Sequence, residues 1–248
     1  MACTALAYFY YQVKAPELSE SADTVAATVK KADLALQAGH YAEAGSLLDG
    51  ALQKMPEDPG ILHQRAVAYL KQSQAAAALP LLNKVLAKNP ADQSALLDRA
   101  GAEYMSHAYG AALRDYETIL QSKDSPYCEG AALGRALCHY SLAHYELAIH
   151  QCREITAKNP RSAKAMELLA NSYLGSGNCR DAVDTYTRCL RLEPRADYYW
   201  GRALAYLRDQ RPASAVGDLK KAVELAPDNK EYRSKLARLT SKVDQKSH

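Results

Sequence analysis

Cysteine and histidine, the usual ligands of zinc, gather in one stretch of this chain. Cys138, His139, His144, His150 and Cys152 all lie between residues 138 and 152. A structural zinc ion needs four ligands that converge on one point. Helical spacing places these side chains on several faces, so we expect that they form no metal site.

Catalytic motifs are missing from the sequence. It contains no phosphate-binding glycine loop, no nucleophile elbow and no HExxH pair. Histidines and carboxylates are spread along the chain without a point of convergence. We therefore predict a protein that is not an enzyme and that uses no cofactor.

Arginine recurs at a regular interval, at Arg65, Arg99, Arg135 and Arg202. Two of these arginines have an acid sixteen residues later: Asp115 follows Arg99, and Asp218 follows Arg202. Gln151 stands at the corresponding place after Arg135. If the intervening chain forms an antiparallel helical hairpin, each arginine can meet its acid. We favour structural ion pairs over the alternative, a row of arginines that bind a ligand.

The arginines belong to a frame that repeats along most of the 248 residues with a step of about 34. Small residues mark its first point, at Ala32, Ala66, Ala100, Ala136, Ala170 and Ala203. They also mark its second point, at Ala44, Ala78, Ala112, Ala148, Ala182 and Ala215. Proline follows at Pro56, Pro90, Pro160, Pro194 and Pro227, with Asp124 in the third copy. Such a period predicts a solenoid of repeated units.

Each copy predicts two helices that cross closely. Alanine at the crossing allows the two axes to approach, and proline ends the second helix before the next copy begins. Two further rows fall on the alanine face of the second helix and predict the core. The first row is Leu48, Leu82, Tyr116, Cys152, Tyr186 and Leu219, and the second is Ala51, Val85, Ile119, Ile155, Cys189 and Ala222.

This frame resembles the tetratricopeptide repeat, a helix–turn–helix unit of about 34 residues. The resemblance rests on the alanines and prolines above and on aromatic residues at two further family positions, namely Tyr69, Tyr173, Tyr206, Tyr41, Tyr109 and Tyr145. It implies an all-α fold, a right-handed superhelix of six hairpins closed by a capping helix. We place the repeats at about 25–58, 59–92, 93–128, 129–162, 163–195 and 196–229, after an apolar segment and linker (1–24) and before a capping helix and basic tail (230–248).

Two departures from the family pattern are local. The third repeat has two extra residues in Ser122–Tyr127, which predict a longer loop. In the sixth repeat Pro212 stands at the start of the second helix, where the first turn accepts proline.

In the resembled family the first helix of each hairpin lines a concave groove. The matching positions here are His63, Val67, Leu70, Leu97, Tyr104, Met105, Leu133, Leu137, Tyr140, Asn171, Trp200 and Arg208. The centre of this set is apolar and aromatic, which suits an apolar or amphipathic protein segment. We expect partner side chains to be buried against Leu97, Tyr104, Leu133, Leu137 and Tyr140. We expect His63, Lys164, Asn171 and Arg208 to set register by hydrogen bonds. The alternative is that neighbouring helices bury the set.

One family ligand is disfavoured by the sequence. Family members that hold acidic C-terminal tails of chaperones use a clamp of Lys, Asn, Asn, Lys and Arg. The corresponding places hold Val29, Asp33, Gln64, Ser94 and Asp98. Two acids there would repel the peptide carboxylates.

The ends of the chain leave alternatives open. Residues 1–13 are apolar and predict a helix packed on the solenoid, the remnant of a membrane anchor, or a lipoprotein start at Cys3. The C-terminal basic residues are Lys230, Arg233, Lys235, Arg238, Lys242 and Lys246. We expect them to solvate the cap rather than to bind acidic lipid, and we expect no nucleic-acid partner. The six cysteines lack disulfide spacing and favour a reducing, cytoplasmic location, with a membrane-anchored or periplasmic one as the alternative.

These features together predict a non-catalytic adaptor that binds a partner peptide or helix in its groove. Two alternatives remain: a membrane-tethered envelope or pilus-type assembly factor, and a regulatory subunit of an enzyme complex.

Overall fold

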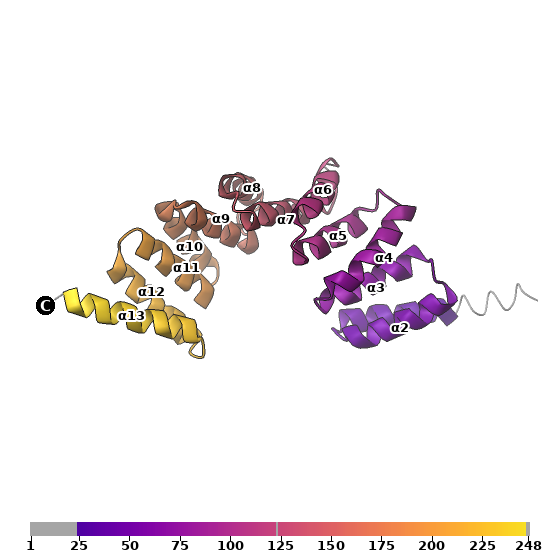
Figure 1. Ribbon diagram of the computed structural model, residues 1–248, viewed down its shortest axis with the longest axis horizontal. Helices are drawn as coiled ribbons and strands as arrows, with labels where there is room; N and C mark the ends of the chain where they lie inside the picture. The colour runs from indigo at the N-terminus through magenta and orange to yellow at the C-terminus, as the bar shows by residue number, and fades with distance from the viewer. Residues whose placement is uncertain (1–23, 123, 247–248) are drawn as a thin grey trace, which may run out of the picture. The chain divides into compact units, whose positions relative to one another are not determined.

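The computed structural model describes residues 24–122 and 124–246, and side chains to residue 241 (Figure 1). Every regular element in these ranges is an α-helix, as predicted. A helix over residues 24–37 comes first. It is followed by α2 (Tyr41–Lys54), α3 (Pro59–Lys71), α4 (Ala75–Lys88), α5 (Gln93–Met105), α6 (Tyr109–Leu120), α7 (Cys128–Ser141), α8 (Tyr145–Lys158), α9 (Ala163–Ser176), α10 (Cys179–Leu192), α11 (Ala196–Arg208), α12 (Pro212–Leu225) and α13 (Lys230–Lys246).

The chain divides into two compact units, one up to Gln121 and one from Ser122 onward. The boundary falls at the start of Ser122–Tyr127, the segment for which the sequence predicts a longer loop. Within each unit consecutive helices pack against one another. In the first unit α3 also contacts α5, and in the second α9 contacts both α7 and α11. The first helices of successive hairpins therefore lie side by side within a unit.

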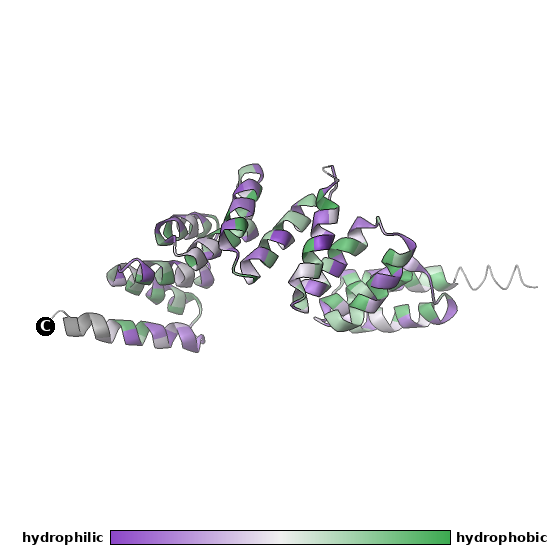
Figure 2. Ribbon diagram, turned by 45° about the horizontal axis from the view of Figure 1, so that its top comes forward, coloured by the Kyte–Doolittle hydropathy of each residue, from purple (hydrophilic) through white to green (hydrophobic). Residues whose placement is uncertain are grey.

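The repeated small residues lie where the hairpins close. All twelve alanines of the two series are 0% exposed. The two core rows on the second helices are also buried, with exposed fractions from 0% to 7%. Figure 2 shows hydrophobic and hydrophilic residues alternating along the helices, as helices with one buried face require. The predicted core is confirmed.

Each hairpin turns through one residue in the left-handed region of backbone space. These residues are Gly39, Ser73, His107, Ala143, Gly177 and Gln210, with φ between 57° and 84°. Glycine accepts this conformation freely, whereas other residues lose about 1 kcal/mol. The turn is thus fixed by the geometry of the hairpin rather than by glycine. Pro212 occupies the first turn of α12, as expected.

None of the helices described by the structure is long and apolar enough to cross a membrane. Residues 1–13, for which the sequence leaves three interpretations open, lie outside the described residues. Those interpretations remain predictions.

The cysteines from Cys128 onward carry free thiols. Cys138, Cys152 and Cys189 are buried. Burial raises the pKa of Cys152 to about 12 and that of Cys189 to about 11. Since the thiolate is the reactive form, these two residues act as small apolar core residues.

Candidate functional site: the face formed by the first helices

The predicted arginine–aspartate pairs form in two hairpins. The Arg99 guanidinium donates to both oxygens of Asp115 at 2.7 and 2.8 Å. Arg202 donates to both oxygens of Asp218 at 2.7 Å. Both aspartates are buried. These arginines therefore join the two helices of a hairpin, and the interpretation as structural ion pairs is confirmed.

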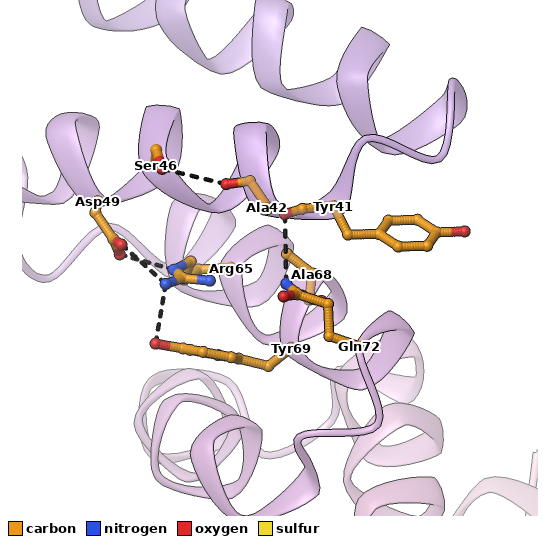
Figure 3. Close-up of polar contacts among 8 residues, drawn as sticks. All are labelled: Tyr41, Ala42, Ser46, Asp49, Arg65, Ala68, Tyr69 and Gln72. Atoms are coloured by element: carbon orange, nitrogen blue, oxygen red, sulfur yellow. Dashed lines mark hydrogen bonds and ion pairs between the residues drawn. The ribbon is translucent and has the colours of Figure 1, made fainter.

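Arg65 forms a pair that the sequence interpretation missed (Figure 3). Its guanidinium donates to Asp49 of α2 at 2.7 and 2.8 Å and to the Tyr69 hydroxyl at 2.9 Å. Asp49 lies sixteen residues before Arg65, and Leu81 stands sixteen residues after it. A search for acids in both directions would have found the pair. Gly45 leaves room for it, because a Cβ there would lie 2.6 Å from Nη1 of Arg65.

Arg135 differs from the other arginines of the series. Its buried Nε atom has no hydrogen-bond partner among the described residues, and neither has the buried Oε1 atom of Gln151. Gln151 occupies the place of Asp115 and Asp218, as the sequence indicates. The fourth hairpin therefore lacks the ion pair that two others have.

In the first unit, the predicted groove residues lie on α3 and α5. Val67, Leu70, Leu97 and Tyr104 are half-buried. Met105 is 41% exposed. The Tyr104 ring lies 5.4 Å from the ring of Tyr109 in the next helix, centroid to centroid. This face offers apolar and aromatic surface.

His63, which is predicted to set register for a partner, already forms a bond within the protein. Its Nε2 atom lies 2.7 Å from Oδ2 of Asp98 on α5. The hydrogen bond to Asp98 raises the pKa of His63, burial opposes this, and the charges of Asp98 and Asp92 add to the increase. The pair links the first helices of two successive hairpins. It also occupies Asp98, one of the acids that disfavour the carboxylate clamp.

In the second unit, the central groove residues come from α7. Leu133, Leu137 and Tyr140 are half-buried and pack against the core of the unit. The rings of Tyr140 and Tyr145 are 5.7 Å apart, edge to face. In the second unit, this region is the apolar counterpart of the α3–α5 face.

Two of the predicted register-setting residues of the second unit, Asn171 and Arg208, already have partners within the protein. The Tyr186 hydroxyl donates to Oδ1 of Asn171 at 2.5 Å. Arg208 donates to the carbonyl oxygen of Leu174. Lys164 is exposed. Lys164 and Arg208 thus both keep their charge at the surface.

Trp200 lies at the end of the second unit. It stacks on Tyr232 of α13, with ring centroids 4.8 Å apart. None of the predicted groove residues is buried: Met105 and Arg208 are exposed, and the others are half-buried. The set can contact a ligand in each unit, and its role in binding stays a prediction.

The described residues contain no group of three or more His, Cys, Asp or Glu side chains placed to hold a metal ion. The rings of His139 and His144 lie 5.9 Å apart. The faces of the first helices can contact apolar side chains of a ligand and can form a small number of hydrogen bonds.

Comparison with known proteins agrees with the architecture. Sequence models described as the tetratricopeptide repeat match residues 35–99 and 167–230. This chain belongs to the tetratricopeptide repeat family. Its all-α class and its character as a protein-interaction scaffold follow from that membership.

Two curated relatives show how far the similarity extends. Sperm-associated antigen 1 of Homo sapiens is 27% identical over 246 residues, which cover 85% of this chain and 27% of that protein. The mitochondrial import receptor subunit TOM34 of Pongo abelii is 27% identical over 240 residues and 77% of each chain. The chain thus spans about a quarter of the first relative and about three quarters of the second.

Solved structures share the fold. A tetratricopeptide repeat protein from Parabacteroides merdae is 26% identical, with a TM-score of 0.68 over 88% of this chain and 84% of that one. PilW, a type IV pilus biogenesis factor, is 15% identical, with a TM-score of 0.78 over 86% of this chain and 98% of that one. At 15% identity the likeness to PilW concerns the fold alone.

Proposed function

We propose that this protein is a non-catalytic adaptor that holds a segment of a partner protein against the first helices of its hairpins. The observation that carries the proposal is the half-buried apolar and aromatic surface on these helices. Leu97, Tyr104 and Met105 supply it in the first unit, and Leu137 and Tyr140 in the second. A soluble monomer rarely leaves such residues accessible in groups unless they bind something.

The chemistry of the partner follows from this surface. Apolar side chains at helical spacing suit a partner helix or extended segment that inserts its own apolar side chains. The internal bonds of His63, Asn171 and Arg208 leave them fewer hydrogen-bonding groups for a partner. Burial of side chains thus supplies most of the affinity. The similarity to an import receptor subunit along most of its length supports a polypeptide as the ligand.

The alternatives have less support. A pilus-type assembly factor would need an anchor, and the segment proposed for that role lies outside the described residues. The similarity to PilW supports a common fold and not a common partner. A regulatory subunit of an enzyme complex is distinguished by co-purification with a catalytic chain. The cytoplasmic location also remains a proposal, which fractionation of cells would test.

The test begins with isolation of a partner by pull-down and mass spectrometry, followed by titration of the purified pair. We expect Tyr104→Ala combined with Tyr140→Ala to weaken binding at least tenfold, since each ring loses a buried contact. Leu147→Ala combined with Leu192→Ala is the control, because these leucines are 51% and 48% exposed on second helices. Unchanged affinity of the tyrosine variant, with an intact melting curve, would contradict the proposal.

A further inference from the structure

A pocket lies between α11 and α13, inside the second unit. Its volume is about 360 Å³, and its lining residues are Trp200, Leu204, Glu231, Ser234, Lys235 and Arg238. This volume falls in the lower part of the range of ligand pockets, which begins near 300 Å³. It has room for one or two side chains of a bound segment.

The wall from α13 is one stripe of that helix. Glu231, Ser234, Lys235 and Arg238 follow the i, i+3, i+4, i+7 spacing of a single helical face. The adjacent stripe docks the helix: Leu236 and Leu239 pack against the core of α11 and α12, and Tyr232 is 6% exposed. The docking of one stripe therefore turns the other toward the pocket.

The wall from α11 is apolar. Trp200 and Leu204 are four residues apart and half-buried. Tyr232 supports the indole by stacking, and its own hydroxyl donates to Asp197 at 2.9 Å. The tryptophan is thus held in place before any ligand arrives, which lowers the entropic cost of binding.

The charge of the pocket is positive. Lys235 and Arg238 form no ion pair among the described residues. Glu231 is the one acid in the lining, and it stands in the first turn of α13, where the helix dipole favours an acid. Two cations that form no ion pair among the described residues, beside an apolar wall, are complementary to an apolar side chain flanked by carboxylates.

We propose that this pocket binds a partner segment in which a leucine-like side chain is flanked by aspartate or glutamate. The apolar side chain contacts Trp200 and Leu204, and the neighbouring carboxylates pair with Lys235 and Arg238. The inference rests on the proposed function, because Trp200 belongs to the predicted groove. It differs in place from the chaperone-tail clamp, whose corresponding positions lie in the first three hairpins and hold Asp33 and Asp98 here.

The experiment uses the full chain and the emission of Trp200, its single tryptophan. The probe is the acetylated peptide Asp-Glu-Leu-Asp-Glu. Two comparison peptides replace either the acids by amides or the leucine by glycine. We expect the first peptide to change the emission of Trp200 in a saturable way. We expect the other two peptides to bind at least tenfold more weakly. Equal binding of the amide peptide would overturn the charge argument, and equal binding of the glycine peptide would overturn the apolar anchor.

Matched variants locate the site. Lys235→Glu with Arg238→Glu should weaken binding of the peptide about tenfold or more. If this charge reversal unfolds α13, the neutral pair Lys235→Gln with Arg238→Gln replaces it. Lys230→Glu with Arg233→Glu changes the net charge equally at exposed residues outside the pocket lining and should change affinity less than twofold. Equal losses of peptide affinity in the two double variants would overturn the proposal.

A final arm separates this inference from the groove and from a membrane role. The Tyr104→Ala, Tyr140→Ala variant should bind the peptide normally, whereas the Lys235, Arg238 variant should still retain apolar partners of the groove. If the peptide does not bind while the groove still binds its apolar partners, this inference is wrong and the proposed function stands. A response of Trp200 to phosphatidylserine vesicles but not to the peptide would assign the basic face to lipid and overturn the proposal.

Discussion

Arg135 differs from Arg99 and Arg202 because it has no aspartate at the matching place in its hairpin. Arg99 and Arg202 each donate to an aspartate of the same hairpin. Gln151 stands at the corresponding place after Arg135, and the buried Nε atom of Arg135 has no hydrogen-bond partner among the described residues. A buried donor without a partner costs about 1–3 kcal/mol. Apolar contacts therefore hold the fourth hairpin together. A partner for Arg135 would raise the free energy of unfolding.

We expect Gln151→Asp to stabilise the chain by about 1 kcal/mol, because the new carboxylate supplies Arg135 with a partner. The reciprocal change, Asp218→Gln, should lose about 3 kcal/mol, because the half-buried Arg202 loses its carboxylate partner. Urea unfolding of the two variants measures both effects. A loss of stability in Gln151→Asp would show that Arg135 is satisfied in another way.

The His63–Asp98 pair makes part of the stability depend on pH. The pKa of His63 is raised in the folded chain, chiefly by the hydrogen bond to Asp98. The folded state thus binds a proton more tightly than the unfolded state does. The resulting stabilisation is complete below the unfolded pKa of about 6.5 and is lost as the pH rises through the folded pKa.

The stability difference between the wild type and His63→Gln should therefore be larger near about pH 5.5 than near about pH 8.5. His150→Gln is the control, because His150 is 73% exposed and its nearest carboxylate lies 4.0 Å away. Thermal melts at the two pH values measure the difference. If the stability difference between the wild type and His63→Gln is the same at the two pH values, the pair is not a source of pH dependence.

At the scale of helices, small residues set how closely neighbours pack. A Cβ at Gly201 of α11 would lie 2.3 Å from Cζ of Tyr186 on α10. The Tyr186 ring is 2% exposed and held by Asn171, so it has no room to withdraw. Gly201 is therefore required by the contact of α10 with α11, although glycine weakens a helix by itself.

We expect Gly201→Ala to lose about 2 kcal/mol through the clash with Tyr186. Gly217→Ala on α12 should instead gain about 0.5–1 kcal/mol, because no atom lies within 4 Å of its Cβ and alanine favours the helix. Denaturant titration compares the two changes. The interpretation fails if both variants are stabilised.

At the scale of the whole molecule, the chain consists of two compact units. Ser122, Asp124 and Pro126 between α6 and α7 are exposed. Exposed residues between elements are the preferred sites of proteolysis. In a repeat protein each hairpin contacts its neighbours, so each unit keeps most of its own core.

Limited digestion with subtilisin should therefore cut first within Ser122–Tyr127 and give two fragments that match the units. Mass spectrometry identifies the cut, and circular dichroism of the separated fragments should show that both remain helical. First cleavage at a hairpin turn, such as Gly177, would contradict this expectation.

The sequence by itself determined the architecture, and the physical reason is local. Helical periodicity places the twelve alanines and the two core rows on the faces where the helices of a hairpin cross, so a regular spacing predicts burial. The pairs of Arg99 and Arg202 followed from the same spacing, because the turn fixes which residues of a hairpin face each other.

The tertiary structure decided contacts between different hairpins. The sequence could not show that Asp98 binds His63 or that Lys235 faces a pocket beside Trp200. Each of these depends on how one hairpin stacks on the next, which the spacing within a hairpin leaves open. The repeat thus specifies the scaffold, and the stacking selects which side chains remain for a partner.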